Sequence, residues 1–190
     1  MTAVSNDYPI HEYIAAVREL AKNESDPQKL TAAVKPLSQR LAASTALQDP
    51  AFRVCDEEQG FGVHLLHEEA NHDLGVFVFC WLPNQGTPPH NHKTWAVVSV
   101  VEGEEYETHW QRNDDGSQAG YAELEQTGVA VMKVGDTSVC LPEEIHGVWN
   151  QGATPSVSLH TYGRHINFTG RSYFDPANNQ EIPYLVTVEE

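Results

Sequence analysis

The sequence has 190 residues, of which 40% are apolar and 20% charged, the proportions of a soluble globular protein with one sizeable core. Its 27 acidic and 11 basic residues give a formal net charge of −16. Such a charge repels phosphate backbones and anionic lipid, so neither nucleic acid nor a membrane is an expected partner. No apolar stretch reaches the length of a membrane span, and the N-terminus does not resemble a secretory signal.

The three cysteines, Cys55, Cys80 and Cys140, are odd in number and contain no CxxC pair. This usage favours free thiols in a reducing compartment. Together with the N-terminal sequence, it predicts a cytoplasmic protein.

The first 48 residues are predicted to be a helical extension. Apolar residues recur at three- and four-residue steps from Ile10 to Leu20 and again from Leu30 to Leu41, as on one face of a helix. Asp26-Pro27 predicts the start of the second helix, because proline is tolerated at the first helical position. Pro36 is expected to kink or divide this helix.

Residues 51–165 are predicted to form a β-sandwich or barrel. Short runs of β-branched and aromatic residues alternate there with Gly, Pro, Asn and Asp, and no helical pattern lies between them. Residues 166–190 are expected to be a C-terminal tail of loop ending in a short strand, so that residues 1–190 form a single domain. The predicted strands are VFVFCW (76–81), TWAVVSVVEG (94–103), EYETHWQR (105–112), GVAVMKVGD (128–136), TSVCLP (137–142) and PSVSLHTY (155–162).

A candidate metal site begins with His90 and His92 in the stretch GTPPHNHKTW. Side chains at positions i and i+2 of a strand point to the same face, so both imidazoles can reach one ion. An HxH pair alone is a weak signal, since surface or core histidines give the same pattern. A third histidine, His146, follows a Gly135-Asp136 turn and Pro142.

This combination of an HxH strand, a later single histidine and an all-β texture resembles the two motifs of the cupin superfamily. The resemblance implies a mainly β cupin fold, a double-stranded β-helix or jelly-roll barrel with N-terminal helices, and a metal held by His90, His92 and His146. The glutamate usual in the first cupin motif is absent, because Trp95 and Ala96 occupy its positions. Three neutral imidazoles leave a divalent metal its full charge and open positions.

A three-histidine site of this kind resembles the thiol dioxygenases, the cysteine dioxygenase family. Ser158, His160 and Tyr162 match the Ser-x-His-x-Tyr signature of that family. On a strand the three side chains share one face and can form a hydrogen-bond relay that presents the phenol to the metal pocket. The alternative is an ordinary strand whose inward residues happen to be polar.

The HxHxxW arrangement and Val97 resemble the 3-mercaptopropionate dioxygenase branch, because cysteine dioxygenases of animals carry a cross-linking cysteine at the position of Val97. Tyr162 is therefore expected to be a free phenol. The resemblance also places Arg171 near the substrate, with Arg164 as its competitor. Val63 or His64 stands where relatives have a substrate-binding Arg or Gln, and His64 is a further candidate for the pocket lining.

The resemblance implies a non-haem Fe(II) thiol dioxygenase, with one iron per chain, that converts a small thiol and O2 to a sulfinate. Two alternatives stay open. One is a different metal-dependent cupin enzyme acting on a carbon substrate, and the other is a non-catalytic module that binds a small molecule. The chain is expected to be a monomer or a weak homo-oligomer.

Overall fold

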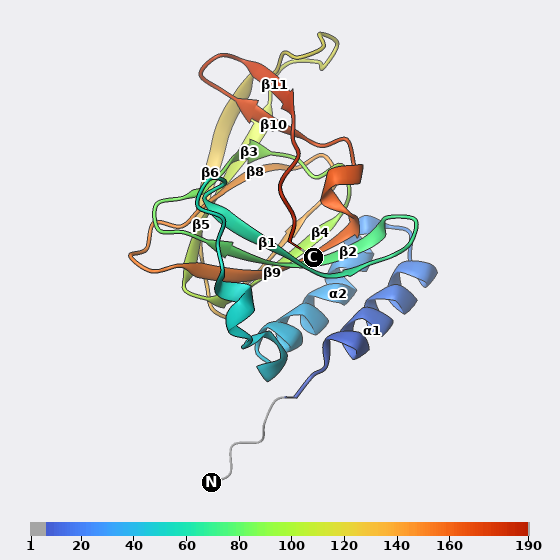
Figure 1. Ribbon diagram of the computed structural model, residues 1–190. Coiled ribbons are helices and arrows are strands. Elements are labelled where there is room, and N and C mark those ends of the chain that lie inside the picture. Colours follow the sequence, from blue (N-terminus) through green and yellow to red (C-terminus); the bar gives the residue numbers. More distant parts are fainter. Residues whose placement is uncertain (1–6, 190) are drawn as a thin grey trace.

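The computed structural model describes residues 7–189, which form two antiparallel β-sheets that face each other (Figure 1). One sheet has five strands in the order β1 (Phe61–Glu68), β2 (Asp73–Trp81), β9 (Ser156–Arg164), β4 (Ala96–Glu102) and β7 (Thr137–Cys140). The other has six strands in the order β11 (Gln180–Pro183), β10 (Ser172–Asp175), β3 (Gly86–His90), β8 (Ile145–Trp149), β5 (Glu104–Arg112) and β6 (Leu124–Lys133).

The strand order identifies the fold. Between β2 and β9, the spatial orders are β2-β9-β4-β7 in one sheet and β3-β8-β5-β6 in the other. Eight strands divided in this way between two antiparallel sheets form a jelly roll, the arrangement found in cupins. The predicted mainly β cupin fold is therefore confirmed.

Two helices precede the strands, α1 (Ile10–Asn23) and α2 (Pro27–Ala42), followed by the short 3-10 helices η1 (Thr45–Leu47) and η2 (Pro50–Arg53). Asp26 caps α2 by accepting hydrogen bonds from the backbone N–H groups of Gln28 and Lys29, as its position before Pro27 predicts. Residues 1–6 of the predicted helical extension lie outside the described residues. Pro36 does not divide α2, because the buried face of this helix packs against β4 and stabilises it on both sides of the proline.

The five-stranded sheet has two different faces. Val76, Val78 and Cys80 of β2 point outward and are buried against α1 and α2. The alternate residues Phe77 and Phe79 point between the two sheets, where they pack in the interior of the jelly roll. This period of two follows from the strand pleat. As a result, one face of the sheet packs against the helices, and the other face lines the interior between the two sheets.

Hydrogen bonds also tie the helices to this outer face. The Tyr13 hydroxyl lies 2.6 Å from the Thr161 hydroxyl of β9. Ser38 of α2 bonds to Ser99 of β4 over 2.7 Å. These buried polar groups are thus paired with one another, as burial requires.

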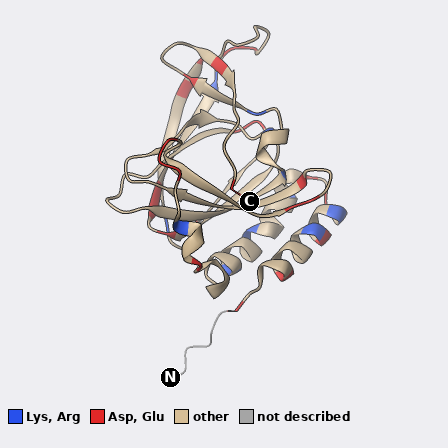
Figure 2. Ribbon diagram, viewed as in Figure 1, with Lys and Arg blue, Asp and Glu red and all other residues tan. Residues whose placement is uncertain are grey.

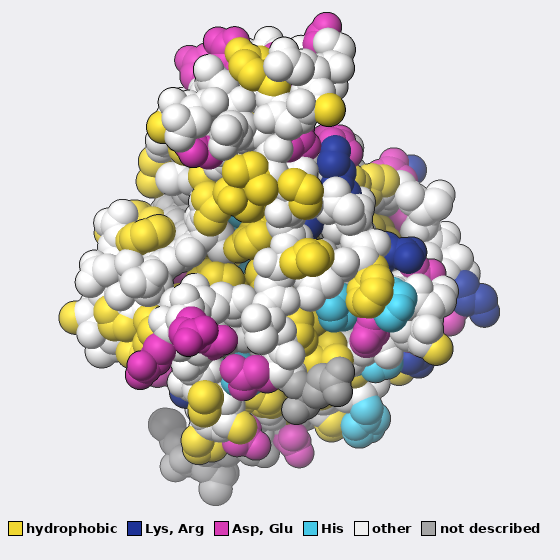
Figure 3. Space-filling model, turned by 45° about the horizontal axis from the view of Figure 1, so that its top comes forward, with side chains coloured by type: hydrophobic (Ala, Val, Ile, Leu, Met, Phe, Trp, Pro, Cys, Tyr) yellow, Lys and Arg dark blue, Asp and Glu magenta, His cyan; other side chains and the backbone are white. Residues whose placement is uncertain are grey.

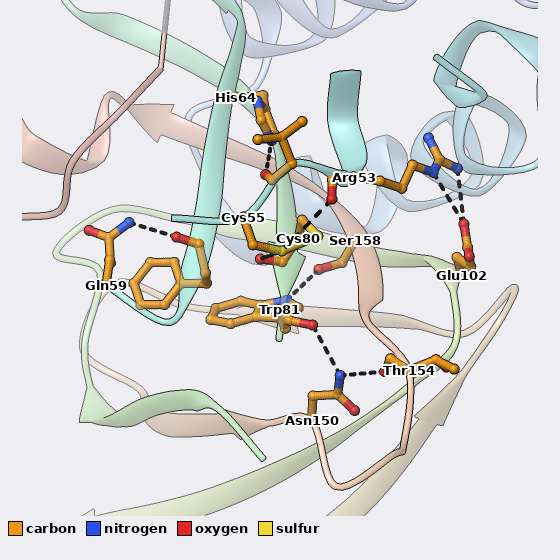
Figure 4. Close-up of a disulfide and its surroundings, with 12 residues drawn as sticks. Arg53, Cys55, Gln59, His64, Cys80, Trp81, Glu102, Asn150, Thr154 and Ser158 are labelled. Atoms are coloured by element: carbon orange, nitrogen blue, oxygen red, sulfur yellow. Dashed lines mark hydrogen bonds and ion pairs between the residues drawn. A yellow bond between two sulfur atoms is a disulfide. The ribbon is translucent and has the colours of Figure 1, made fainter. Parts of the chain in front are cut away.

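Two of the three cysteines form a disulfide. Cys55, in the loop after η2, is bonded to Cys80 on the outer face of β2 (Figure 4). The prediction of free thiols is therefore wrong for this pair. Cysteine usage thus no longer supports a reducing compartment. The pairing depends on the fold, which brings two residues 25 positions apart to a Cα separation of 5.7 Å. Cys140 is free and buried.

The C-terminal segment after β11 runs across the open end between the two sheets (Figure 1). Its end pairs with β1: the Glu189 N–H donates to the Val63 carbonyl over 2.7 Å, and the Leu65 N–H donates to the Glu189 carbonyl over 3.0 Å. The tail is more ordered than predicted, because it also contains η3 (Ile166–Phe168) and the β10–β11 hairpin. Residue 190 lies outside the described part.

In the ribbon of Figure 2, basic residues are marked on α1 and α2 as well as elsewhere, and acidic residues are spread over helices, loops and strands. Five of the basic residues lie on α1 and α2, namely Arg18, Lys22, Lys29, Lys35 and Arg40. Within residues 7–189, no helix is long and apolar enough to cross a membrane.

Reducing the Cys55–Cys80 disulfide is predicted to lower the free energy of unfolding by about 3 kcal/mol, because the bond closes a loop that the reduced unfolded chain leaves open. Urea unfolding with and without a reductant measures the difference. The Cys55→Ala variant should resemble the reduced protein and should not respond to the reductant. A wild-type unfolding midpoint that ignores the reductant would contradict the prediction.

Candidate metal centre

Three buried histidines meet in the interior of the jelly roll. His90 ends β3, His92 follows two residues later, and His146 is the second residue of β8, where it pairs with His90 across the sheet. Their residues are 5%, 1% and 4% exposed. One ring nitrogen of each lies within 4.8 Å of those of the others. The three can therefore hold one metal ion.

The geometry agrees with imidazole ligands around a common centre. The Nε2 atoms of His92 and His146 are 3.3 Å apart. Two metal–nitrogen bonds of about 2.1 Å at angles between 90° and 110° would separate their nitrogens by about 3.0–3.4 Å. The His90 Nδ1 lies 2.9 Å from the Pro88 carbonyl and can donate to it, which leaves the Nε2 of that ring for a metal.

The side chains of His90 and His92 point to the same site, but not through the strand alternation that the sequence predicts. His92 lies beyond the end of β3, so strand alternation does not orient it. The intervening Asn91 does this instead, because its backbone N–H donates to the Ser172 carbonyl and its side-chain oxygen accepts from the Ser172 N–H. The Lys93 backbone adopts a positive φ of 54° and turns the chain directly after His92.

A carboxylate that the sequence analysis missed orients the third histidine. Glu107 of β5 accepts a hydrogen bond from the His146 Nδ1 over 2.6 Å, and the Ser138 hydroxyl donates to the same oxygen over 2.8 Å. The bond directs the His146 Nε2 towards the other two histidines. The only sequence signal for Glu107 is its position two residues after Glu105 on an alternating strand.

The Glu107–His146 pair is charge-assisted. Burial opposes ionisation of Glu107, but hydrogen bonds from His146 and Ser138 outweigh it and lower its pKa. Burial likewise lowers the pKa of His146, but the neighbouring Cys140 and Glu107 raise it to about 10. Glu107, Cys140 and His146 also lie close enough for a metal ion. The short bond between Glu107 and His146 nevertheless makes Glu107 a partner of the ligand in this arrangement.

The hydrogen bonds of the predicted Ser–His–Tyr relay are present in β9. The Ser158 hydroxyl lies 2.9 Å from the His160 Nε2, and the His160 Nδ1 lies 2.8 Å from the Tyr162 hydroxyl. Trp81 adds a donor at the far end, because its indole N–H donates to the Ser158 oxygen over 3.1 Å. Burial lowers the pKa of His160 far below its ordinary value and raises that of Tyr162, which favours neutral forms of both. The catalytic role of the relay stays a prediction.

Arg171 is buried at 4% exposure and lines the same cavity as the histidines. Within residues 7–189 it forms no ion pair, and its Nε and Nη2 atoms have no hydrogen-bond partner. Its guanidinium lies over the Tyr184 ring, 4.2 Å from the ring centre. A buried guanidinium with unused donors is suited to an anionic group. Arg164, the competing candidate, instead pairs with Asp73 at the surface.

His64 does not line the pocket, and this prediction is wrong. Its ring points to the outer side of β1, where its Nε2 lies 2.8 Å from the Val54 carbonyl. The strand pleat explains the error, because the adjacent Val63 takes the inward position and packs in the interior core.

The strand pleat also turns Val97 towards the helices, and the residue paired with Tyr162 across β4 and β9 is Ala96. No cysteine faces Tyr162 from β4.

The space at the centre is small, with a free volume of about 10 Å³, roughly that of one water molecule. Phe79, Trp81, Tyr184 and Val186 enclose it together with the polar side chains. Figure 3 views the molecule from the side of the β10–β11 hairpin and shows hydrophobic side chains gathered over the middle of this face. Most of the site is thus shielded from solvent.

The Glu107→Gln substitution is predicted to lower the affinity for a divalent metal about 10–100-fold, the usual effect of losing the partner of a metal-bound histidine. Titration of the metal-free protein, followed by calorimetry, measures this. Glu104→Gln is the matched control, because it makes the same change three positions away on the opposite face of β5. His92→Ala should abolish tight binding. Undiminished affinity in Glu107→Gln would remove the proposed role of this carboxylate.

No protein-family model matches the chain. Among solved structures, it is similar to a protein with a double-stranded β-helix domain from Klebsiella pneumoniae (18% identity, 67% of this chain and 95% of that chain, TM-score 0.48). It is also similar to oxalate oxidase (20%, 56% and 52%, 0.44) and to an RmlC-like cupin from Shewanella frigidimarina (20%, 58% and 81%, 0.42). The match spans about half of the oxalate oxidase chain. Because all three TM-scores are below 0.5, the assignment of the chain to the cupin fold rests on its strand order.

Proposed function

We propose that the protein is a mononuclear non-haem Fe(II) dioxygenase, with one iron per chain, that oxidises a small thiol to its sulfinate. The observation that carries the proposal is the combination of a buried three-histidine site, the Ser158–His160–Tyr162 relay and the unpaired Arg171 around one cavity. Both atoms of O2 end on sulfur, so that a thiol and O2 give a sulfinate and one proton.

The residues present fit such an ion. Burial lowers the pKa values of His90 and His92 far below their ordinary value, which keeps their nitrogens available as ligands. His146, whose pKa is raised to about 10, would release its Nε2 proton when a metal binds. Three neutral ligands would then preserve the positive charge of the metal, and an iron bound there would supply the redox chemistry with O2 and favour the deprotonated thiol. Tyr162, held by His160, would donate to or accept from the bound substrate and move its proton.

Arg171 supports a substrate that carries a carboxylate. Burying a carboxylate without a partner costs several kcal/mol, and the free donors of Arg171 supply that partner. An ammonium group on the substrate would need an acceptor, and Glu107 is already bonded to His146 and Ser138. We therefore propose 3-mercaptopropionate as a better substrate than cysteine.

Two other functions compete with this one. A cupin enzyme acting on a carbon substrate, or a module that binds a small molecule without reaction, could have the same fold and metal ligands.

We also propose that the protein is a monomer or weak homo-oligomer and has no nucleic acid or membrane partner. A cytoplasmic location is part of it too, although the Cys55–Cys80 disulfide speaks against that compartment. Mass spectrometry after alkylation in native cells would report the state of the two cysteines.

Oxygen uptake by the iron-loaded protein should be fastest with 3-mercaptopropionate, slower with cysteine and slowest with cysteamine, which lacks a carboxylate. Sulfinate formation, measured by mass spectrometry, should match the oxygen consumed. No uptake with any thiol, despite stoichiometric iron, would favour a binding module.

The Arg171→Met substitution should raise the KM for 3-mercaptopropionate at least about 10-fold, because it removes the charged partner of the carboxylate. Turnover of cysteamine should change little. Arg164→Met is the matched control, since Arg164 pairs with Asp73 at the surface. Equal effects of the two substitutions on KM would argue against carboxylate binding by Arg171.

The Tyr162→Phe substitution should slow turnover about 10²–10⁴-fold, the range for a general acid or base, while leaving metal affinity unchanged. Tyr13→Phe provides a control, because Tyr13 is also buried but bonds to Thr161 on the outer face of β9. A Tyr162→Phe enzyme with the wild-type rate would limit the relay to a structural role.

A further inference from the structure

The cavity at the candidate metal centre is too small for a substrate as it stands. Its free volume of about 10 Å³ is roughly that of one water molecule. A small thiol that carries a carboxylate is several times larger than water. Part of the wall must therefore move before such a molecule can bind beside the histidines and Arg171.

Most of that wall is fixed in the two sheets. Its residues lie largely on β2, β3, β8 and β9, and each of these strands is paired with a neighbour on both sides. Moving one of them would break backbone hydrogen bonds along two ladders. Among the described residues, the parts of the wall outside these strands are His92, Arg171, Tyr184 and Val186.

Tyr184 and Val186 belong to one segment, residues 184–189, which we call the C-terminal strap. It crosses the open end between the two sheets (Figure 1). Within the part of the chain that the structure describes, residues 184–188 pair with no strand, and Glu189 is bridged to β1. The strap is thus less firmly held by backbone bonds than the rest of the wall.

Two amide side chains hold the strap in place of a neighbouring strand. The Asn167 amide donates to the Val186 carbonyl over 2.8 Å and accepts from the Val186 N–H over 3.0 Å. The Gln59 amide accepts from the Thr187 N–H over 2.8 Å and donates to the Thr187 carbonyl over 3.3 Å. Because these partners are side chains, the bonds can break without opening either sheet.

Tyr184 is tied to Arg171, which separates it from the rest of the strap. Its N–H donates to the Arg171 carbonyl over 3.0 Å, and the guanidinium lies over its ring, 4.2 Å from the ring centre. Residues 185–189 are therefore the part that can lift while Tyr184 stays beside Arg171. Within this part, Val186 points inward at 8% exposure and Leu185 outward at 70%.

A second route to the site is less suitable for a substrate. A cavity of about 700 Å³ reaches His146 from the side of Glu107 and Cys140. Among residues 7–189, the two cavities share only His146, and neither Arg171 nor Tyr162 lines the larger one. A ligand that enters there meets the Glu107–His146 bond instead of the groups that would bind it.

We propose that residues 185–189 are the gate of the substrate cavity and that Val186 sets the size of the ligand that the gate admits. Release of the bonds from Gln59 and Asn167 lets the segment move outward. Withdrawal of the Val186 side chain then enlarges the cavity beside the histidines and Arg171. The inference rests on the proposed function for the identity of the ligand, whereas the gate itself can be tested without turnover.

Removing either amide should speed the release of zinc from the zinc-loaded, full-length protein to a chelator, because the metal leaves through the same opening. Asn167→Ala and Gln59→Ala should each raise the release rate at least about 10-fold, since each removes two hydrogen bonds that hold the gate shut. Asn178→Ala is the matched control, because the Asn178 side chain bonds to Asp175 in the β10–β11 turn instead of to the strap. Unchanged release in both variants, or an equal increase in Asn178→Ala, would overturn the proposal.

The adjacent residues Val186 and Leu185 test the size limit. Val186→Ala should lower the KM for 3-mercaptopropionate with an added methyl branch at least about 10-fold, because a hydrophobic wall discriminates by about that factor per carbon. Leu185→Ala, which shortens the outward side chain, should leave this KM unchanged. Equal effects of the two substitutions would contradict a role for Val186 in size selection.

Amide hydrogen exchange of the wild type decides the matter if the variants fail to fold. The N–H groups of Val186, Thr187 and Glu189 should exchange together and at least about 100-fold faster than those of β9, because the gate opens without the sheets. Protection equal to that of β9 would overturn the proposal. Failure of the dioxygenase function would appear as no turnover of any thiol and would leave zinc release and amide exchange unaffected, so the two failures are distinguishable.

Discussion

Every charged or polar group in the interior of this jelly roll must find a partner, because water is excluded from it. Glu107 meets that requirement through His146, and the Ser158–His160–Tyr162 relay meets it internally. The nitrogens of His90, His92 and His146 lie close enough to share one cation, and two donors of Arg171 have no partner among the described residues. The interior therefore holds a candidate metal site and, on the same cavity, a buried guanidinium with unused donors.

The helices compensate for the stability that the polar interior costs the fold. A jelly roll whose inner space holds charged residues loses part of its apolar core, and α1 and α2 create a second core on the outer face of the five-stranded sheet. Leu41, Val76 and Leu159 are completely buried there. Burial of apolar side chains contributes roughly 1.5–3 kcal/mol each, which offsets the cost of the polar site.

Patterns confined to one segment were predictable from the sequence. The helix start at Pro27 and the strands β2, β4, β5, β6, β7 and β9 follow from local periodicity. The grouping of His90, His92 and His146 came from the resemblance to the two cupin motifs, and β1 was missed. Features that depend on contacts between distant strands were not. The Cys55–Cys80 disulfide needs the loop before β1 to lie beside β2, and Glu107 reaches His146 only because β5 pairs with β8. His64 failed as a pocket residue for a simpler reason, since the pleat allows only one of two adjacent residues to point inward.

The alternation in β9 also sets how the site can change during evolution. Its residues Val157, Leu159 and Thr161 face the helices, whereas the relay residues alternate with them on the inner face, where His160 and Tyr162 line the pocket. Inserting or deleting one residue in this strand would exchange the two sets, placing apolar side chains around the metal and the relay against the helices. We therefore expect insertions to be tolerated better in the largely exposed loop at 113–120 than within β9. Divergence of this protein can proceed by substitution within the strand and by changes of length outside it.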